Sequence, residues 1–311
     1  MKPLLSLIVF AALALLATLA CGGDNAGRAP TTAPAQLTPT PREFPFSTPA
    51  PATRRAGVPT GIVSFGETGV PAVPGDAAVY LSLGGSLQYG CCADPQLSSH
   101  PLFAQYLSQR LNRPVVWVSL AGNDTAVEFI DGVGGNPPQL DRAVAALQEY
   151  RRQGRDVVAI TLSIGGNDLL ALRTGMGCTG GGRPECIDAF AQLLERYTKQ
   201  MQLIYSRLNE AKDPRTPILQ NNYYDAMDCG RPGDDVSTSA IAIQIFNQPI
   251  EGAIRIHGAF LRDFYTAFRR KACEYISGVD PTYAGYDAIL AVDKATYEAL
   301  PSEYVQPFFA P

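Results

Sequence analysis

The chain has 311 residues, of which 46% are hydrophobic, 9% aromatic and 17% charged. This composition is ordinary for a globular protein, and it excludes a wholly disordered, collagen-like or coiled-coil chain. The 25 Lys and Arg are outnumbered by 29 Asp and Glu, so the net charge of -4 offers no basic surface for nucleic acid. Because the sequence has only two histidines, His100 and His257, a multi-histidine metal site is nearly excluded, and we expect no metal or cofactor.

Residues 1–20 are typical of a signal peptide. After a positively charged start, the segment from Leu4 to Ala20 is almost wholly apolar, yet short for a membrane-spanning helix. Ala20 directly before Cys21 resembles a bacterial lipobox, in which the cysteine becomes diacylated. We therefore expect an exported lipoprotein that Cys21 holds on the outer face of the cell membrane. An uncleaved anchor helix and a plain secretory signal are the alternatives.

Residues 21–59 are rich in Pro, Thr and Ala. Such a segment buries too little apolar surface to fold, and it favours extended polyproline II conformations. We predict that it links the lipid-modified cysteine to one folded domain, residues 60–311, and that the protein is a monomer.

The folded part alternates short apolar segments with helical patterns. The predicted strands are Ala78–Leu83, Val115–Leu120, Val157–Ile164 and the weaker Ile218–Gln220 and Ala259–Asp263. The first three end at or next to glycine, and a helical pattern follows each of them. Continuous apolar strands of this kind indicate a parallel sheet that is buried on both faces. We therefore predict an α/β fold, a three-layer α/β/α sandwich with right-handed crossovers.

Apolar residues at steps of three and four predict the helices between the strands. The longest such stripe faces a core through Ile187, Phe190, Leu194, Tyr197, Met201, Ile204 and Leu208. Shorter helices are predicted at Leu102–Leu111 and Leu140–Arg152, and a final helix at Ala284–Leu300.

Six cysteines besides Cys21 suggest disulfides in an exported chain: Cys91, Cys92, Cys178, Cys186, Cys229 and Cys273. Cys178 and Cys186 bracket a short Gly-rich loop, so we expect them to pair. We expect Cys91 and Cys92 each to bridge to one of the last two, because the loops that hold them follow strands at the same sheet edge. The chain has no C-x-x-C pair to support a metal site.

Three loops should meet at one edge of the predicted sheet. Ser86 follows the first strand, Gly122 the second and Asn167 the third. Ligands of open parallel sheets bind beyond the carboxyl ends of the strands, where these loops lie. The loops offer a hydroxyl, backbone N–H groups and a carboxamide. These groups are the parts of an acyl-transfer site, with a nucleophile and donors for an oxyanion.

The same loops resemble three sequence blocks of the SGNH hydrolases, also called GDSL-type esterases. The matching segments are Leu83-Gly84-Gly85-Ser86-Leu87, Leu120-Ala121-Gly122 and Ser163-Ile164-Gly165-Gly166-Asn167-Asp168. The resemblance implies that Ser86 is the nucleophile and that Gly122 and Asn167 donate to the oxyanion. It covers roughly residues 75–300 and implies a flavodoxin-like sheet, with esterases, lipases and deacetylases as relatives.

The chain departs from the family pattern at two places. Gly85 stands where the first block carries Asp. The last block reads Asp-x-x-His-Pro, and here Ser277 stands at the Asp and Asp280 at the catalytic His, while Pro281 is kept. Asp280 is therefore the candidate base, although an aspartate suits neutral pH badly unless it is buried. Because aspartate is shorter than histidine, its position leaves room for a bridging water.

Other residues near the blocks have ordinary structural interpretations. We expect Asp168 to fix its turn, and His257 to lie at the carboxyl end of a helix, far from Ser86. His100 follows the Ser86 block in a predicted loop at the site edge, so it is the alternative base.

Two functions of different classes are compatible with this sequence. The first is a weak or unusual hydrolase of carboxylic esters, small-molecule, lipid or glycan, that uses Ser86 with Asp280 or His100. The second is a non-catalytic SGNH-fold lipoprotein that binds an acylated or glycan ligand at the cell surface. A purely structural lipoprotein is a weaker third, because Ser86, Gly122 and Asn167 are all present.

Overall fold

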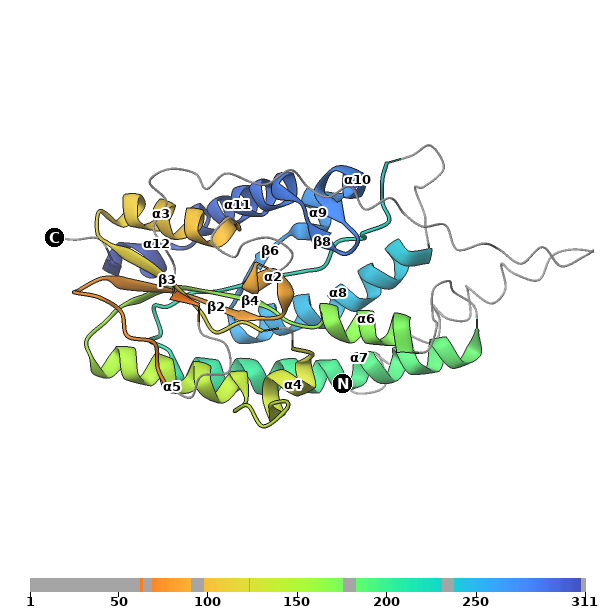
Figure 1. Ribbon diagram of the computed structural model, residues 1–311, viewed down its shortest axis with the longest axis horizontal. Coiled ribbons are helices and arrows are strands. Elements are labelled where there is room, and N and C mark those ends of the chain that lie inside the picture. Colours follow the sequence, from red (N-terminus) through yellow and green to blue (C-terminus); the bar gives the residue numbers. More distant parts are fainter. Residues whose placement is uncertain are drawn as a thin grey trace, which may run out of the picture. The chain divides into compact units, whose positions relative to one another are not determined.

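The computed structural model describes residues 62–63, 69–90, 98–122, 124–175, 183–230 and 238–308, which all belong to one compact unit. Its centre is a six-stranded parallel sheet with the order β1-β3-β2-β4-β5-β6 (Figure 1). The strands are β1 (Ile62–Val63), β2 (Ala78–Gly84), β3 (Val115–Ser119), β4 (Val157–Ser163), β5 (Ile218–Asn221) and β6 (Phe260–Arg262). The last five coincide with the predicted segments, and only the short edge strand β1 was not predicted.

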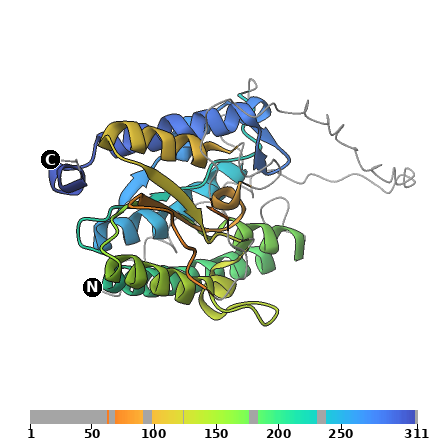
Figure 2. The same ribbon diagram turned by 60° about the vertical axis from the view of Figure 1, so that its left-hand side comes forward.

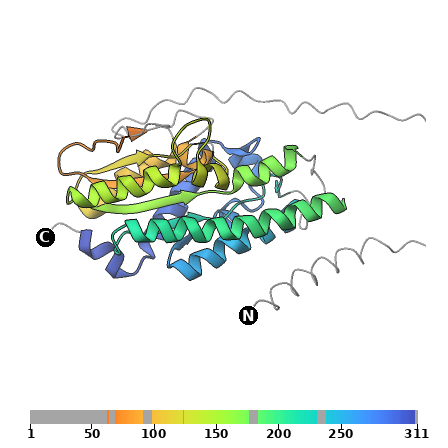
Figure 3. The ribbon, with the colours of Figure 1, turned by 90° about the horizontal axis from the view of Figure 1, so that it is seen from below.

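Helices cover both faces of this sheet. They are α2 (Ser86–Tyr89), α3 (Ser99–Leu111), α4 (Ala126–Asp131), α5 (Gln139–Arg152), α6 (Gly166–Gly175), α7 (Pro184–Ala211), α8 (Thr238–His257), α9 (Phe264–Phe268), α10 (Ala272–Tyr275), α11 (Tyr283–Glu298) and α12 (Ser302–Val305), with a 3-10 turn at Gln306–Phe308. Figure 2 shows the sheet between α3 and α11 on one side and α5, α7 and α8 on the other. Seen from below in Figure 3, α5, α7 and α8 lie side by side. The predicted three-layer α/β/α sandwich is therefore confirmed.

Successive side chains of a strand point to opposite faces of the sheet, so the core has two parts, one on each face. Val79 and Leu81 of β2 pack with α5, α7 and α8, whereas Ala78 and Tyr80 pack with α3 and the end of α11. Every residue of β2 is buried, as a strand covered on both faces requires. Among the described helices, none is long and apolar enough to cross a membrane.

The predicted stripe of α7 is correct only over its carboxyl-terminal part. Tyr197, Met201 and later members are buried, whereas Ile187 is 38% exposed. Figure 1 shows the first turns of α7 projecting beyond the sheet, so they have less to pack against.

Two glycines let the strands end abruptly. Gly84, the last residue of β2, has a φ of 118°, and a Cβ there would collide with the carbonyl oxygen of Ser163. Gly165, just after β4, has a φ of 115°, and its Cβ would lie 2.7 Å from the ring of Tyr197. Side chains at these positions would be strained, so glycine permits both sharp turns at the carboxyl edge.

The disulfide prediction for Cys229 and Cys273 was wrong. These two cysteines pair with each other, with their Cα atoms 5.0 Å apart. The loop after β5 packs directly on α10, because Asp228 accepts the backbone N–H groups of Arg270 and Ala272 at 2.8 and 2.9 Å.

The remaining disulfide predictions cannot be followed to both partners. Cys186 is disulfide-bonded. Its predicted partner Cys178 lies outside the described residues, as do Cys91 and Cys92.

Candidate active site

Ser86 opens the four-residue helix α2 directly after β2. The residue before it, Gly85, caps the helix with no side-chain hydrogen bond, and its N–H donates to the Ser163 carbonyl at 2.7 Å. The turn is therefore bound to the end of the neighbouring strand β4. This bond places the half-buried Ser86 at the carboxyl edge of the sheet.

A small hairpin brings Asp280 to Ser86. Its two strands, β7 (Ile276–Ser277) and β8 (Asp280–Pro281), pair antiparallel, with Ser277 opposite Asp280. The Ser86 hydroxyl hydrogen-bonds the Asp280 carboxylate, which lowers the pKa of that carboxyl. The Tyr224 hydroxyl donates to the carbonyl of Val279 at 2.9 Å and holds the tip of the hairpin beside β5.

The surroundings of Asp280 make it a stronger base than an ordinary aspartate. Burial raises the pKa of its carboxyl, and the hydrogen bond from Ser86 lowers it by less. The Asp280 charge in turn adds to the raised pKa of the buried Tyr224 and Tyr286 hydroxyls, for which burial is the larger cause. The carboxylate therefore sits between aromatic neighbours and a potential nucleophile.

Gly122 lies in the loop after β3 and Asn167 in the first turn of α6, and both already donate hydrogen bonds. The Gly122 N–H donates to the Gly84 carbonyl at 3.0 Å and so continues the ladder between β2 and β3. The Asn167 amide donates to the Asp124 carbonyl at 3.2 Å. Gly122 can stabilise an oxyanion only if its N–H leaves or shares the Gly84 carbonyl.

Gly85 faces the Asn167 amide. A Cβ at Gly85 would lie 3.3 Å from Asn167 Nδ2 and 3.4 Å from the carbonyl oxygen of Asp124. The aspartate that the family pattern carries here would therefore need Asn167 to move by a few tenths of an ångström.

Gln139 braces the end of β2 and was not predicted from the sequence. Its Oε1 accepts the Gly84 N–H at 2.6 Å, and its Nε2 donates to the Gly84 carbonyl at 3.2 Å and to Asp124 Oδ2 at 2.6 Å. Burial raises the pKa of the Asp124 carboxyl, and the bond from Gln139 lowers it. Nothing in the sequence distinguishes Gln139 from any other polar residue at the start of a helix.

Asp168 has the structural position that we expected. Its buried carboxylate accepts the backbone N–H of Ala126 at 2.8 Å, which ties the first turn of α6 to the start of α4. Burial raises the pKa of this carboxyl, and the bond from Ala126 lowers it.

The expectation that His100 lies in an exposed loop was wrong. His100 belongs to α3 and is 1% exposed, stacked on Trp117. Its Nε2 lies 3.0 Å from the Leu87 carbonyl and its Nδ1 2.7 Å from the Tyr80 hydroxyl. Because both ring nitrogens are engaged and burial lowers the pKa of His100 to about 3, it cannot be the proton acceptor for Ser86.

His257 ends α8, as predicted. Its ring stacks on that of Tyr205, with the ring centroids 5.2 Å apart, and burial lowers its pKa. Of the described residues, no group of three or more His, Cys, Asp or Glu side chains is arranged to hold a metal ion.

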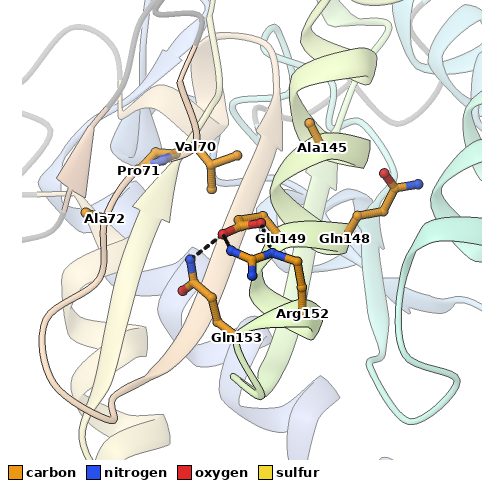
Figure 4. A pocket seen from close by; sticks show the side chains of 8 residues that line it. All are labelled: Val70, Pro71, Ala72, Ala145, Gln148, Glu149, Arg152 and Gln153. Atoms are coloured by element: carbon orange, nitrogen blue, oxygen red, sulfur yellow. Dashed lines mark hydrogen bonds and ion pairs between the residues drawn. The ribbon is translucent and has the colours of Figure 1, made fainter.

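A surface hollow lies elsewhere in the domain. Figure 4 shows it between residues 70–72 and the carboxyl-terminal half of α5, where Glu149 bonds to Arg152 and Gln153. The hollow lies near the amino-terminal end of β4, because α5 ends at Arg152 and β4 begins at Val157. Ser86 lies at the opposite, carboxyl edge of the sheet, and none of the residues around it line the hollow. The hollow therefore takes no part in the candidate site.

The sequence profile of the GDSL-like lipase/acylhydrolase family matches residues 82–288. This stretch includes the turn after β2, the loops after β3 and β4, and the β7–β8 hairpin. The chain belongs to this family. A comparison with curated protein sequences finds no significant match.

Solved structures of family members share the fold. The chain is similar to the lipase Lip_vut3 from a goat rumen metagenome, with 20% identity, 71% of this chain and 97% of that chain covered, and a TM-score of 0.53. It is also similar to an extracellular lipase from Streptomyces rimosus (16% identity, 71% and 100% covered, TM-score 0.50). A phospholipase A1 from Streptomyces albidoflavus NA297 is a third (17% identity, 71% and 99% covered, TM-score 0.50).

The burial of His100 predicts how stability depends on pH. Its pKa falls from 6.5 to about 3 on folding, so the unfolded chain binds more protons below pH 6.5. Between pH 7 and pH 5 this group should lower the free energy of unfolding by about 2 kcal/mol. Urea unfolding at both pH values should show that His100→Gln loses most of this slope, while His257→Gln keeps it. An unchanged slope in His100→Gln would contradict the buried neutral imidazole.

Proposed function

We propose that the protein hydrolyses carboxylic esters, with Ser86 as the nucleophile and Asp280 as the general base. The hydrogen bond from the Ser86 hydroxyl to the Asp280 carboxylate is the observation that carries the proposal. A serine hydroxyl is a poor nucleophile until a base takes its proton, and Asp280 is in contact with that proton. Membership of the GDSL-like lipase/acylhydrolase family supports the same chemistry.

The proposed reaction has two steps, acylation of Ser86 and hydrolysis of the acyl-enzyme. Ser86 Oγ attacks the ester carbonyl carbon while its proton passes to Asp280, and the resulting acid then protonates the departing alcohol. Water next attacks the acyl-enzyme, gives its proton to Asp280, and Ser86 recovers the proton as the carboxylic acid leaves. The Asn167 amide, with the Gly122 N–H once it turns from Gly84, donates to the oxyanion.

Two features predict a low rate for this reaction. Asp280 is a weaker base than the histidine of the family pattern, although burial raises its pKa toward neutrality. A carboxylate beside the nucleophile also repels the developing oxyanion unless the donors outweigh it. We therefore propose weak turnover, most easily seen with activated short-chain esters.

Lipid, glycan and small-molecule esters are the proposed substrates. Two lipases and a phospholipase A1 share the fold, which favours acyl esters as the class to test first.

Substitution of the two partners tests the proposed function. Ser86→Ala should abolish hydrolysis of p-nitrophenyl acetate, and Asp280→Asn should lower it, by less than the roughly 10²–10⁴-fold that a well-matched general base contributes. In the unmodified protein the rate should rise with pH as Asp280 ionises, with an apparent pKa above that of an ordinary aspartate. Ordinary enzyme rates that survive Asp280→Asn would refute the dyad.

A gain of activity provides the reciprocal arm of that test. Ser277 and Asp280 lie opposite each other in the hairpin, so an aspartate at 277 can orient a histidine at 280. Asp280→His combined with Ser277→Asp should raise the rate by about 10²–10⁴-fold, and Asp280→His alone by less. No gain in the double variant would mean that the hairpin does not hold the position of the base.

A non-catalytic binding function is the second candidate. The bond between the Gly122 N–H and the Gly84 carbonyl favours it, because this donor is already satisfied within the protein. Such a protein would bind acylated or glycan ligands without turning them over. Binding of short-chain acyl esters with no acid release over days, unchanged in Ser86→Ala, would favour this candidate over hydrolysis.

We also propose that the protein is an exported, monomeric lipoprotein, anchored through Cys21. The disulfide between Cys229 and Cys273 supports an oxidising compartment. In a bacterial host, Cys21→Ser should shift the protein from the membrane fraction to the soluble one. A Cys21→Ser protein that stays in the membrane fraction would indicate another mode of attachment, and sedimentation of the released protein tests the monomer.

A further inference from the structure

The helix that carries Ser86 is too short to hold itself in place. α2 has four residues and no side-chain cap, and isolated turns of this length are unstable in water. Its carbonyl groups instead accept hydrogen bonds from side chains beneath it. Ser82 and Ser119 donate to the Gln88 carbonyl at 3.2 and 3.4 Å. The position of Ser86 therefore depends on buried polar groups of the sheet.

The sheet supplies these groups on the face that packs against α3 and α11. Near the strand starts this face is apolar, at Ala78, Val115 and Ala159. Toward the carboxyl ends it carries buried polar side chains: Tyr80, Ser82, Trp117, Ser119, Thr161 and Arg262.

A closed series of hydrogen bonds begins and ends on α2. With its amide turned to satisfy both neighbours, Gln88 donates to Thr161 Oγ1 at 2.7 Å. A carbonyl only accepts, so His100 Nε2 donates to Leu87 and His100 Nδ1 accepts from Tyr80, at 2.7 Å. The Tyr80 oxygen is then left to accept from Thr161, at 2.8 Å. Each hydrogen bond in the series therefore has one donor and one acceptor.

The same glutamine is bound to a buried ion pair. Its amide oxygen accepts from both terminal nitrogens of Arg262, at 3.1 and 3.0 Å. Arg262 Nε lies 3.0 Å from Asp293 Oδ1, and both side chains are fully buried. The guanidinium also lies over the ring of Phe264, 4.7 Å from its centroid. Burying two charges is costly, and apolar residues of similar size often serve stability as well or better.

This ion pair connects β6, which ends at Arg262, to α11, which carries Asp293. The N-cap of α11, Thr282, comes two residues after Asp280, and Asp293 lies about three helical turns further along. Gln88 lies two residues after Ser86 on α2. The series Gln88–Arg262–Asp293 is thus a polar link between the segment of the nucleophile and the segment of the base.

We infer that Gln88, Arg262 and Asp293 are positioning residues that set the Ser86 hydroxyl against the Asp280 carboxylate. This inference rests on the proposed function for its effect on rate, and on the contacts above for its effect on α2. A displacement of about 1 Å at a reacting group can cost about 10²-fold in rate. A variant in which α2 is loosened should therefore hydrolyse esters slowly even where its fold is intact.

Two variants and a matched control test the inference. Gln88→Met removes the link and leaves the ion pair, whereas Arg262→Met with Asp293→Leu removes both charges together, so neither leaves an unpaired buried charge. The control is Arg113→Met with Asp156→Leu, which removes a 2.6 Å ion pair at the opposite, amino-terminal end of the strands. All three are compared with the unmodified protein at a temperature where circular dichroism shows them folded.

Amide hydrogen exchange of residues 86–90 is the first readout, with residues 139–152 as the internal reference. Both test variants should exchange about 10-fold faster than the unmodified protein at 86–90 and equally at 139–152, and the control should change neither. For p-nitrophenyl acetate, kcat should fall by about 10–100-fold in the test variants while KM stays the same.

The two readouts separate the possible failures. Unchanged exchange at 86–90 in both test variants would overturn the inference, as would faster exchange with an unchanged kcat. If the unmodified protein hydrolyses no ester, the proposed function fails, and the exchange of 86–90 alone then decides whether the link holds α2.

Discussion

The hydrogen bond between the Ser86 hydroxyl and the Asp280 carboxylate joins two parts of the chain that the sheet keeps apart. Ser86 is placed by β2, whose end is fixed to β4 through the Gly85 N–H and the Ser163 carbonyl. Asp280 is placed by the β7–β8 hairpin, whose Val279 carbonyl accepts from Tyr224 and which follows α10, the helix of the disulfide-bonded Cys273.

The electrostatics of this pair set the limits of its chemistry. Burial raises the pKa of Asp280, which makes the carboxylate more willing to take the Ser86 proton. The same carboxylate opposes the negative charge that develops on the substrate, and the Gly122 N–H is engaged by Gly84. The arrangement therefore favours proton abstraction and disfavours oxyanion formation, which is why we propose a slow enzyme rather than an efficient one.

The sheet could be predicted from the sequence, because the strands are continuous apolar segments. They end at glycines that the turns require, such as Gly84 and Gly165. The sequence was also sufficient to place Ser86 and Asp280 at matching positions of a known family. It was not sufficient for contacts made across the fold. His100 reads as a loop residue after Ser98-Ser99, yet Ser98 caps a helix that carries it into the core. The pairing of Cys229 with Cys273 likewise depends on how the loop after β5 packs against α10.

Asp280 accepts a hydrogen bond from Ser86 within a partly desolvated site. Carbon-13 NMR of the aspartate carboxyl groups, with Asp280 assigned by its loss in Asp280→Asn, measures this directly. We expect the pKa of Asp280 to lie above that of an ordinary aspartate and to rise further in Ser86→Ala, because the hydroxyl that lowers it is gone. An Asp280 pKa that is ordinary in the unmodified protein, or the same in Ser86→Ala, would contradict the hydrogen bond between the two residues.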